Sequence, residues 1–199
     1  MCTKKRETIL FIIAAFLFVM AGSLFMVLHL GKKKQQIPQA DYTKLILERV
    51  IYLEQKTERQ IIDNQWAYWG NDSFNGLELQ QLAAKDHLFF YFSEKVCPPC
   101  MIAAIDLIKR YIPEYEHHDT VIFISPDWPY RLRNDCYGKK LLTLQNGTLG
   151  IALEAEDAPF FFKLSPEMAL TSVHVVAKVD FKRTEDFIKY FIMNHKLLK

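Results

Sequence analysis

One stretch of the sequence, residues 88–110, constrains the fold more than any other. It opens with five consecutive apolar residues, LFFYF at 88–92, and such a run predicts a strand buried on both faces of a parallel or mixed sheet. A short polar loop and the motif C-P-P-C at 97–100 follow. Apolar residues then recur at helical spacing until Pro113 ends the run. The stretch therefore predicts a strand, a cysteine pair and a helix, in that order.

The cysteine pair lies at the predicted start of the helix. The first turn of a helix presents unpaired N–H groups and the positive end of the helix dipole, and both stabilise a thiolate. Pro98 and Pro99 fit this place because helix starts tolerate proline, and they stiffen the motif loop. Cys97, nearer the helix start, is predicted to be the more exposed and reactive thiol. Cys100 is predicted to be the buried thiol that resolves a mixed disulfide.

The cysteine count narrows the chemistry. The chain has four cysteines, and Cys2 and Cys136 stand alone. A structural zinc site usually needs four Cys or His ligands, so no metal and no other cofactor is predicted. A disulfide that closes a two-residue loop constrains the unfolded chain little. Redox chemistry is therefore the best use of Cys97 and Cys100.

A strand that runs into C-x-x-C and a helix resembles the thioredoxin superfamily, and Ala158-Pro159 before the apolar run FFFKL reinforces the likeness. The resemblance covers roughly residues 75–199. It implies a thioredoxin-like α/β fold, in which a central mixed sheet is flanked by helices. It also implies that Pro159 has a cis peptide bond and lies beside the cysteines, and that Ala158 offers backbone hydrogen bonds to an extended substrate. The last strand is expected at 173–179 and the closing helix at 180–198.

The chain departs from the family pattern at two positions. Family members often carry Trp before the first cysteine, where this chain has Val96, and thioredoxins carry a buried Asp at the position of Tyr91. A tyrosine cannot serve as a base at neutral pH. Glu94, the nearest carboxylate, is predicted to be a solvated loop residue. These changes point to a divergent, membrane-tethered branch and leave the direction of the activity open.

An apolar segment at residues 9–30 precedes the predicted domain. It is long enough to cross a bilayer, which takes about 20 residues, and three basic residues flank each end. A cleaved secretory signal is the alternative, but the run exceeds a usual signal core and no clear cleavage site follows it. We expect an uncleaved anchor in a bacterial inner membrane, with residues 32–199 in the periplasm. A tether outside the cytoplasm keeps a dithiol near membrane proteins that exchange electrons with it.

The sequence divides into an anchor at 1–34, a helical spacer at 35–70 and a thioredoxin-like domain at 71–199. The spacer helix is predicted over 41–69. Its polar end makes a poor coiled-coil seam, so a helix that lies on the domain or spaces it from the membrane is favoured over a dimerisation helix. A first short element is expected within 74–84.

Two further segments follow the cysteine helix. Residues 120–125, TVIFIS, predict a second buried strand. A short helix is expected near 132–142. Between them, a set of aromatic and basic residues could line a groove, but packing of a loop is favoured; these are Trp128, Tyr130, Arg131 and Arg133. His117 and His118 are predicted to lie in a solvated loop rather than to bind a metal.

The charge distribution bears on function. Residues 1–34 hold six Lys/Arg and one Glu, whereas residues 35–199 hold 19 basic and 22 acidic residues. The absence of a basic stripe argues against nucleic-acid binding. The sequence favours a membrane-tethered thiol–disulfide oxidoreductase, whose partners are protein thiols and disulfides and, through residues 9–30, the lipid bilayer. The alternatives are a thioredoxin-like binding module without activity and a membrane-anchored assembly protein.

Overall fold

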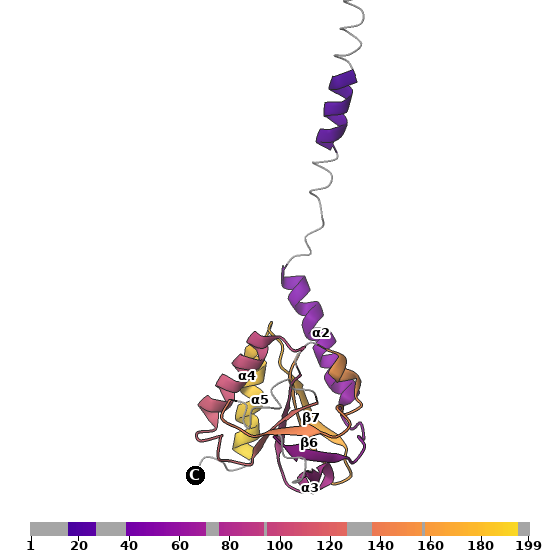
Figure 1. Cartoon of the computed structure of the whole chain (residues 1–199). Helices are drawn as coiled ribbons and strands as arrows, with labels where there is room; N and C mark the ends of the chain where they lie inside the picture. Colours follow the sequence, from indigo (N-terminus) through magenta and orange to yellow (C-terminus); the bar gives the residue numbers. More distant parts are fainter. Residues whose placement is uncertain are drawn as a thin grey trace, which may run out of the picture. The chain divides into compact units, whose positions relative to one another are not determined.

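The computed structural model divides the chain into two compact units, Met1–Tyr42 and Thr43–Lys199 (Figure 1). It describes residues 16–26, 39–70, 76–93, 95–126, 137–156 and 158–194. Residues 16–26 form a helix in the first unit. The second unit contains the sheet and the helices that pack on it.

A mixed sheet of seven strands runs through the described residues in the order β2-β1-β5-β4-β3-β6-β7. The strands are β1 Trp66–Trp69, β2 Gly76–Glu78, β3 Leu88–Tyr91, β4 Val121–Ser125, β5 Leu141–Leu144, β6 Phe160–Leu164 and β7 Leu170–Val175. The helices are α2 Gln39–Thr57, α3 Leu79–Ala83, the 3-10 helix η2 Ala152–Ala155, α4 Pro98–Tyr111 and α5 Phe181–Asn194. Strand β4 is parallel to β3 and β5, and the remaining neighbours pair antiparallel.

The centre of this sheet has thioredoxin-like topology, as the sequence predicted. Strand β3, helix α4 and strand β4 form a parallel β-α-β unit, and β6 pairs with the other side of β3 in the antiparallel sense. Strand β7 extends the sheet beyond β6, and α5 closes the fold. Strands β1 and β2 add an antiparallel hairpin beyond β5.

The sheet is covered on both faces, so β3 is buried along its whole length as predicted. Leu88 and Phe90 face a cluster formed with the buried residues of α4 and α5. Phe89 and Tyr91 face the opposite cluster, which includes residues of α2 and α3. Figure 1 shows α4 and α5 together on one side of the sheet. This alternation follows from the two-residue period of a strand.

Two carboxylates, Glu54 of helix α2 and Glu58 just after its end, hold this segment to the edge strand β7. Glu58 accepts hydrogen bonds from the N–H groups of Ser172 and Val173, both at 3.0 Å, and Glu54 accepts one from Val175 at 2.6 Å. An edge strand otherwise presents unpaired backbone groups that can pair with another chain. The second half of the helix therefore lies on the domain, and Glu54 and Glu58 accept hydrogen bonds from N–H groups at the sheet edge.

Glu54 also belongs to a polar cluster between α2, β7 and α5. Its carboxylate pairs with Arg183, and the Nδ1 atom of His174 lies 3.6 Å from it. The Nε2 atom of His174 lies 3.0 Å from the Thr184 hydroxyl. Burial, and then the charge of Arg183, lower the pKa of His174 to about 3. The imidazole is therefore neutral at physiological pH.

The prediction of one helix over 41–69 is wrong in its second half. Helix α2 ends at Thr57, and Arg59 has a positive φ of 66°. Residues 66–69 instead form β1, which pairs with β2 and β5. Aromatic residues at both Trp66 and Trp69 favour a strand once partner strands are present. The sheet thus includes residues that precede 71, the predicted start of the domain.

The short helix predicted near 132–142 is also wrong where the structure describes it. Leu141 begins β5, which pairs in parallel with β4, and residues 127–136 lie outside the described residues. Tertiary pairing overrides the local pattern here. The strand predicted at 120–125 is confirmed as β4. The last strand ends at Val175 rather than 179, and the closing helix is described from Phe181 to Asn194.

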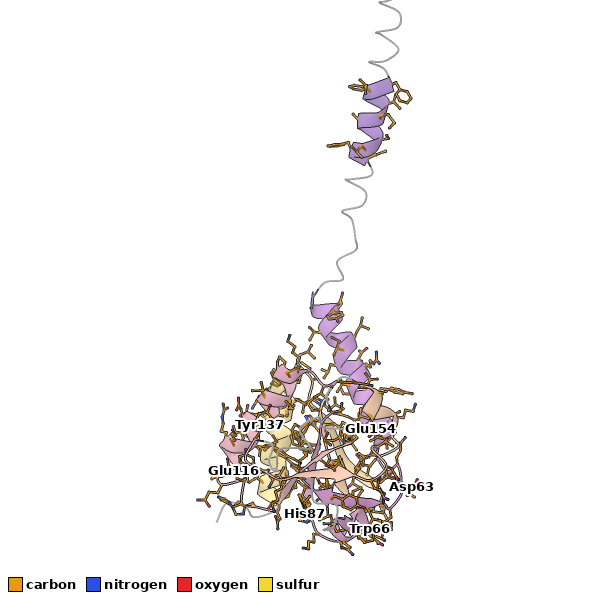
Figure 2. All side chains as sticks on the ribbon, viewed as in Figure 1. Asp63, Trp66, His87, Glu116, Tyr137 and Glu154 are labelled. Carbon is orange, nitrogen blue, oxygen red and sulfur yellow. The ribbon has the colours of Figure 1, made fainter. Side chains whose placement is uncertain are left out.

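The predicted membrane segment is described only in part. Residues 16–26 form a helix whose side chains are all exposed, and in Figure 2 they radiate from it on all sides. Within the ranges that the structure describes, no helix is both long and apolar enough to cross a membrane. The remainder of the predicted segment at 9–30 lies outside those ranges.

Candidate redox site

The two cysteines of the motif occupy different environments at the start of α4. Cys97 is the N-cap residue and is partly exposed, whereas Cys100 is buried, with 3% of its surface exposed. The predicted difference in exposure is confirmed. Cys100 packs in the apolar cluster between the sheet, α4 and α5. Cys97 is thus the more accessible sulfur of the pair.

The double proline shapes the helix start. Pro98 and Pro99 occupy the first two helical positions, as predicted, and both are exposed. The N–H groups of Cys100 and Met101 both donate to the carbonyl oxygen of Cys97, at 3.0 and 3.1 Å. Among the described residues, helix α4 gives the Cys97 side chain no capping hydrogen bond. The helix therefore begins in a regular manner but directs its first N–H groups to a carbonyl rather than to the sulfur.

Burial is the main reason that Cys100 resists ionisation. Burial raises the pKa of Cys100 to about 12, and two effects of Cys97 add to this shift: a hydrogen bond between the two side chains and the charge of Cys97. Lys178 opposes this shift through its charge and its main-chain hydrogen bond. Lys178 lies in the turn between β7 and α5, which the hydrogen bond from the Asp180 N–H to the Ala177 carbonyl closes at 3.1 Å. Cys100 is therefore protonated at neutral pH.

Tyr91 takes the place of the family's buried aspartate and is tied to a second carboxylate. Its hydroxyl donates to Glu154 at 2.7 Å. Burial, and then this hydrogen bond, raise the pKa of Tyr91 far above its ordinary value. Tyr91 therefore stays protonated and cannot accept a proton from Cys100.

Glu154, labelled in Figure 2, also accepts hydrogen bonds from the loop before η2. The Thr148 hydroxyl donates to it at 2.6 Å. The N–H groups of Leu149, Gly150 and Ile151 donate at 2.9, 2.9 and 3.2 Å. This carboxylate fixes a loop and is already saturated with donors, which suits a structural role.

The prediction of a cis bond at Pro159 is wrong. No peptide bond within the described residues is cis, so the bond between Ala158 and Pro159 is trans. The trans form is the ordinary preference of an X–Pro bond. Pro159 is buried, and its carbonyl accepts the N–H of Val176 at 2.9 Å. Its predicted place beside the cysteines and the substrate role of Ala158 remain predictions.

Several predicted residues lie outside the described residues. They are Cys2, Glu94, Trp128, Tyr130, Arg131, Arg133 and Cys136. Conversely, two residues of the site's surroundings were missed by sequence reasoning. Lys178 lies far from the motif in the chain, and only the sheet topology brings it to Cys100. Glu154 carries no motif, and only the fold joins it to Tyr91.

The chain has low sequence identity to the solved structures that it is similar to. No protein-family model and no curated protein matches the chain. The mitochondrial 2-Cys peroxiredoxin of Plasmodium falciparum is 10% identical, with a TM-score of 0.39, over 70% of this chain and 95% of that one. BsSco, a member of the Sco family of cytochrome c oxidase assembly proteins, is 16% identical, with a TM-score of 0.40, over 71% and 96%.

The thioredoxin domain of a thiol-disulfide oxidoreductase from Bacteroides vulgatus is 19% identical, with a TM-score of 0.38, over 65% of this chain and 98% of that one. Likeness at these values does not by itself establish fold or activity. The thioredoxin-like fold rests instead on the strand order and on the place of the cysteine pair between β3 and α4.

Proposed function

We propose that the protein is a thiol–disulfide oxidoreductase that exchanges disulfides with protein partners through Cys97 and Cys100. The observation that carries this proposal is the asymmetry of the pair: a partly exposed Cys97 at a helix start and a buried Cys100 beside it. Disulfide exchange needs one sulfur that meets the partner and a second that is kept from it until the mixed disulfide has formed.

The chemistry follows two attacks. The Cys97 thiolate attacks a partner disulfide, a mixed disulfide forms, and the first partner sulfur leaves and takes up a proton. Cys100 then gives up its proton and attacks the Cys97 sulfur, so the second partner sulfur leaves as a thiol. The reverse sequence transfers a disulfide to a partner. The charge and main-chain hydrogen bond of Lys178 favour the Cys100 thiolate that the second attack requires.

The surface beside Cys97 favours an apolar partner segment. Pro98, Pro99 and Ile102 are exposed, and Ile102 has 48% of its surface accessible. Ala158 is proposed to hydrogen-bond an extended partner chain, and Pro159 to shape the groove. A partner that presents its disulfide between apolar side chains would cover this surface.

We further propose that residues 9–30 anchor the protein in a bacterial inner membrane, with the redox domain in the periplasm. Support comes from the apolar sequence and from the exposure of apolar side chains along residues 16–26, such as Phe18 with 83% of its surface accessible. An export-dependent reporter fused after Lys199 is expected to be active. Activity of a cytoplasmic reporter at the same point, with an inactive export reporter, would overturn this topology.

A trapping experiment tests the redox function. The Cys100→Ser variant cannot resolve a mixed disulfide, so it is expected to retain partner proteins through Cys97, and reduction should release them. The matched Cys97→Ser variant is expected to retain none. Equal retention by both variants, or by neither, would favour a binding module without redox activity.

A further inference from the structure

We infer that the Cys97–Cys100 pair is built to donate electrons to a partner disulfide, because its loop withholds from the Cys97 sulfur the N–H groups that a helix start normally offers. This inference rests on the proposed function and specifies its direction. The partner is then a protein disulfide, and a second protein dithiol restores the pair.

The missing donors follow from the positions of the prolines. An N-cap side chain normally accepts a hydrogen bond from the N–H of the second or third helical residue. The second residue is Pro99, which has no N–H. The third is Cys100, whose N–H donates to the Cys97 carbonyl at 3.0 Å. Both donors that would stabilise a Cys97 thiolate are therefore absent or engaged elsewhere.

The direction follows from the stability of the reduced form. A strongly oxidising pair owes its power to stabilisation of its reduced state. Hydrogen bonds to a charged group are stronger than those to a neutral one and change an equilibrium by about tenfold or more. A pair whose helix offers no N–H bond to the Cys97 sulfur has a less stabilised reduced state than a pair that has such bonds, so it gives up its electrons more readily.

Cys100 replaces the missing N–H groups only in part, because its thiol, a weak donor, hydrogen-bonds to Cys97. Burial raises the pKa of Cys100 to about 12, and Lys178 offsets that shift only in part. At neutral pH the reduced pair therefore contains no stabilised thiolate at Cys100. In each turnover, two electrons and two protons pass from the pair to the partner disulfide, which becomes two thiols, while the Cys97–Cys100 bond forms.

The two prolines offer a matched experiment on the full-length chain. Pro99→Ala restores the N–H at the second helical position, one of the two that an N-cap side chain normally bonds. Pro98→Ala restores one at the first position, which an N-cap side chain does not normally use. Each protein is equilibrated with graded ratios of reduced and oxidised dithiothreitol, and the oxidised fraction is measured by thiol alkylation and intact mass.

The wild-type pair is expected to titrate within the dithiothreitol series. Pro99→Ala is expected to shift the equilibrium about tenfold toward the reduced pair, and Pro98→Ala less than about threefold. Pro99→Ser supplies the same N–H should the alanine variant fail to fold. Equal shifts for the two prolines, or no shift for Pro99→Ala, would overturn the inference.

The outcomes separate the inference from the proposed function. A wild-type pair that stays reduced throughout the dithiothreitol series and oxidises only in excess glutathione disulfide would be an oxidant, so the inference would fail while redox function stood. A pair that forms no internal disulfide under any condition would overturn the proposed function itself.

Discussion

The sites at Cys97 and Glu154 differ in the number of main-chain N–H groups that donate to the acidic side chain. Glu154 accepts hydrogen bonds from three main-chain N–H groups and two hydroxyls. Within the described residues, the Cys97 side chain receives no capping bond from its own helix. Main-chain N–H donors are therefore concentrated on a carboxylate that fixes a loop, whereas helix α4 offers none to the Cys97 sulfur.

Glu54 extends the comparison to the edge of the sheet. Its carboxylate joins α2, β7 and α5 through Val175 and Arg183. Such buried charges stabilise a fold only while every partner is present. The carboxylate clusters are thus rigid parts of the molecule, and their loss should affect stability more than redox chemistry. The following predictions test that distinction, from the largest expected effect to the smallest.

Glu54→Ala should destabilise the fold by about 3–5 kcal/mol, because it leaves Arg183 without its buried partner. The free energy of unfolding in a denaturant titration measures this. Glu48→Ala is the matched control on the same helix, since its exposed pair with Lys44 should contribute less than about 1 kcal/mol. Similar losses for the two variants would contradict the role given to Glu54.

Glu154→Ala should cost about 2–4 kcal/mol of stability, because a partly buried group of donors loses its acceptor. Glu167→Ala, at an exposed position of the turn between β6 and β7, is the control. The exchange activity of folded Glu154→Ala should remain, since Glu154 belongs to η2 and binds Tyr91, which packs in the opposite core cluster from Cys100. If the folded variant lost its exchange activity, Glu154 would instead have a role in the redox reaction.

Acid should destabilise the protein through His174. The unfolded chain binds a proton near pH 6.5, whereas the folded state resists protonation until about pH 3. The stability present above pH 6.5 is therefore lost as pH falls toward 3, by up to about 1.4 kcal/mol per pH unit. His174→Gln should flatten this dependence, and His117→Gln, which is exposed, should not. Equal pH profiles for all three proteins would refute this.

Tyr91→Phe should cost about 1 kcal/mol, because Glu154 keeps four other donors. It should leave the rate of disulfide exchange within about twofold, since the protonated hydroxyl accepts no proton from Cys100. A stopped-flow assay with a disulfide peptide measures the rate. A large loss of rate at unchanged stability would assign Tyr91 a catalytic part.

The local sequence was sufficient for the centre of the fold. The run LFFYF, the cysteine motif and the helix that ends before Pro113 predict β3 and α4 because their burial pattern and helix start are local properties. The same holds for β4. The relative exposure of Cys97 and Cys100 follows from their places at the helix start.

The outer parts needed the tertiary structure. Strands β1 and β5 pair with each other across more than seventy residues of sequence, so neither the end of α2 nor the strand at Leu141 has a local signal. The contacts of Lys178 with Cys100 and of Glu154 with Tyr91 also arise only when distant segments meet. The trans bond at Pro159 shows that a family feature does not transfer with its sequence context.

The proposal that Cys97 attacks and Cys100 resolves is tested most directly by mapping alkylation of the reduced protein at neutral pH. A limiting alkylating agent is added, and peptide mass spectrometry follows the labelling of Cys97 and Cys100 over time. Cys97 is expected to be labelled well before Cys100, which is buried and has a pKa raised to about 12. Equal rates, or faster labelling of Cys100, would contradict the assignment of Cys97 as the attacking thiol.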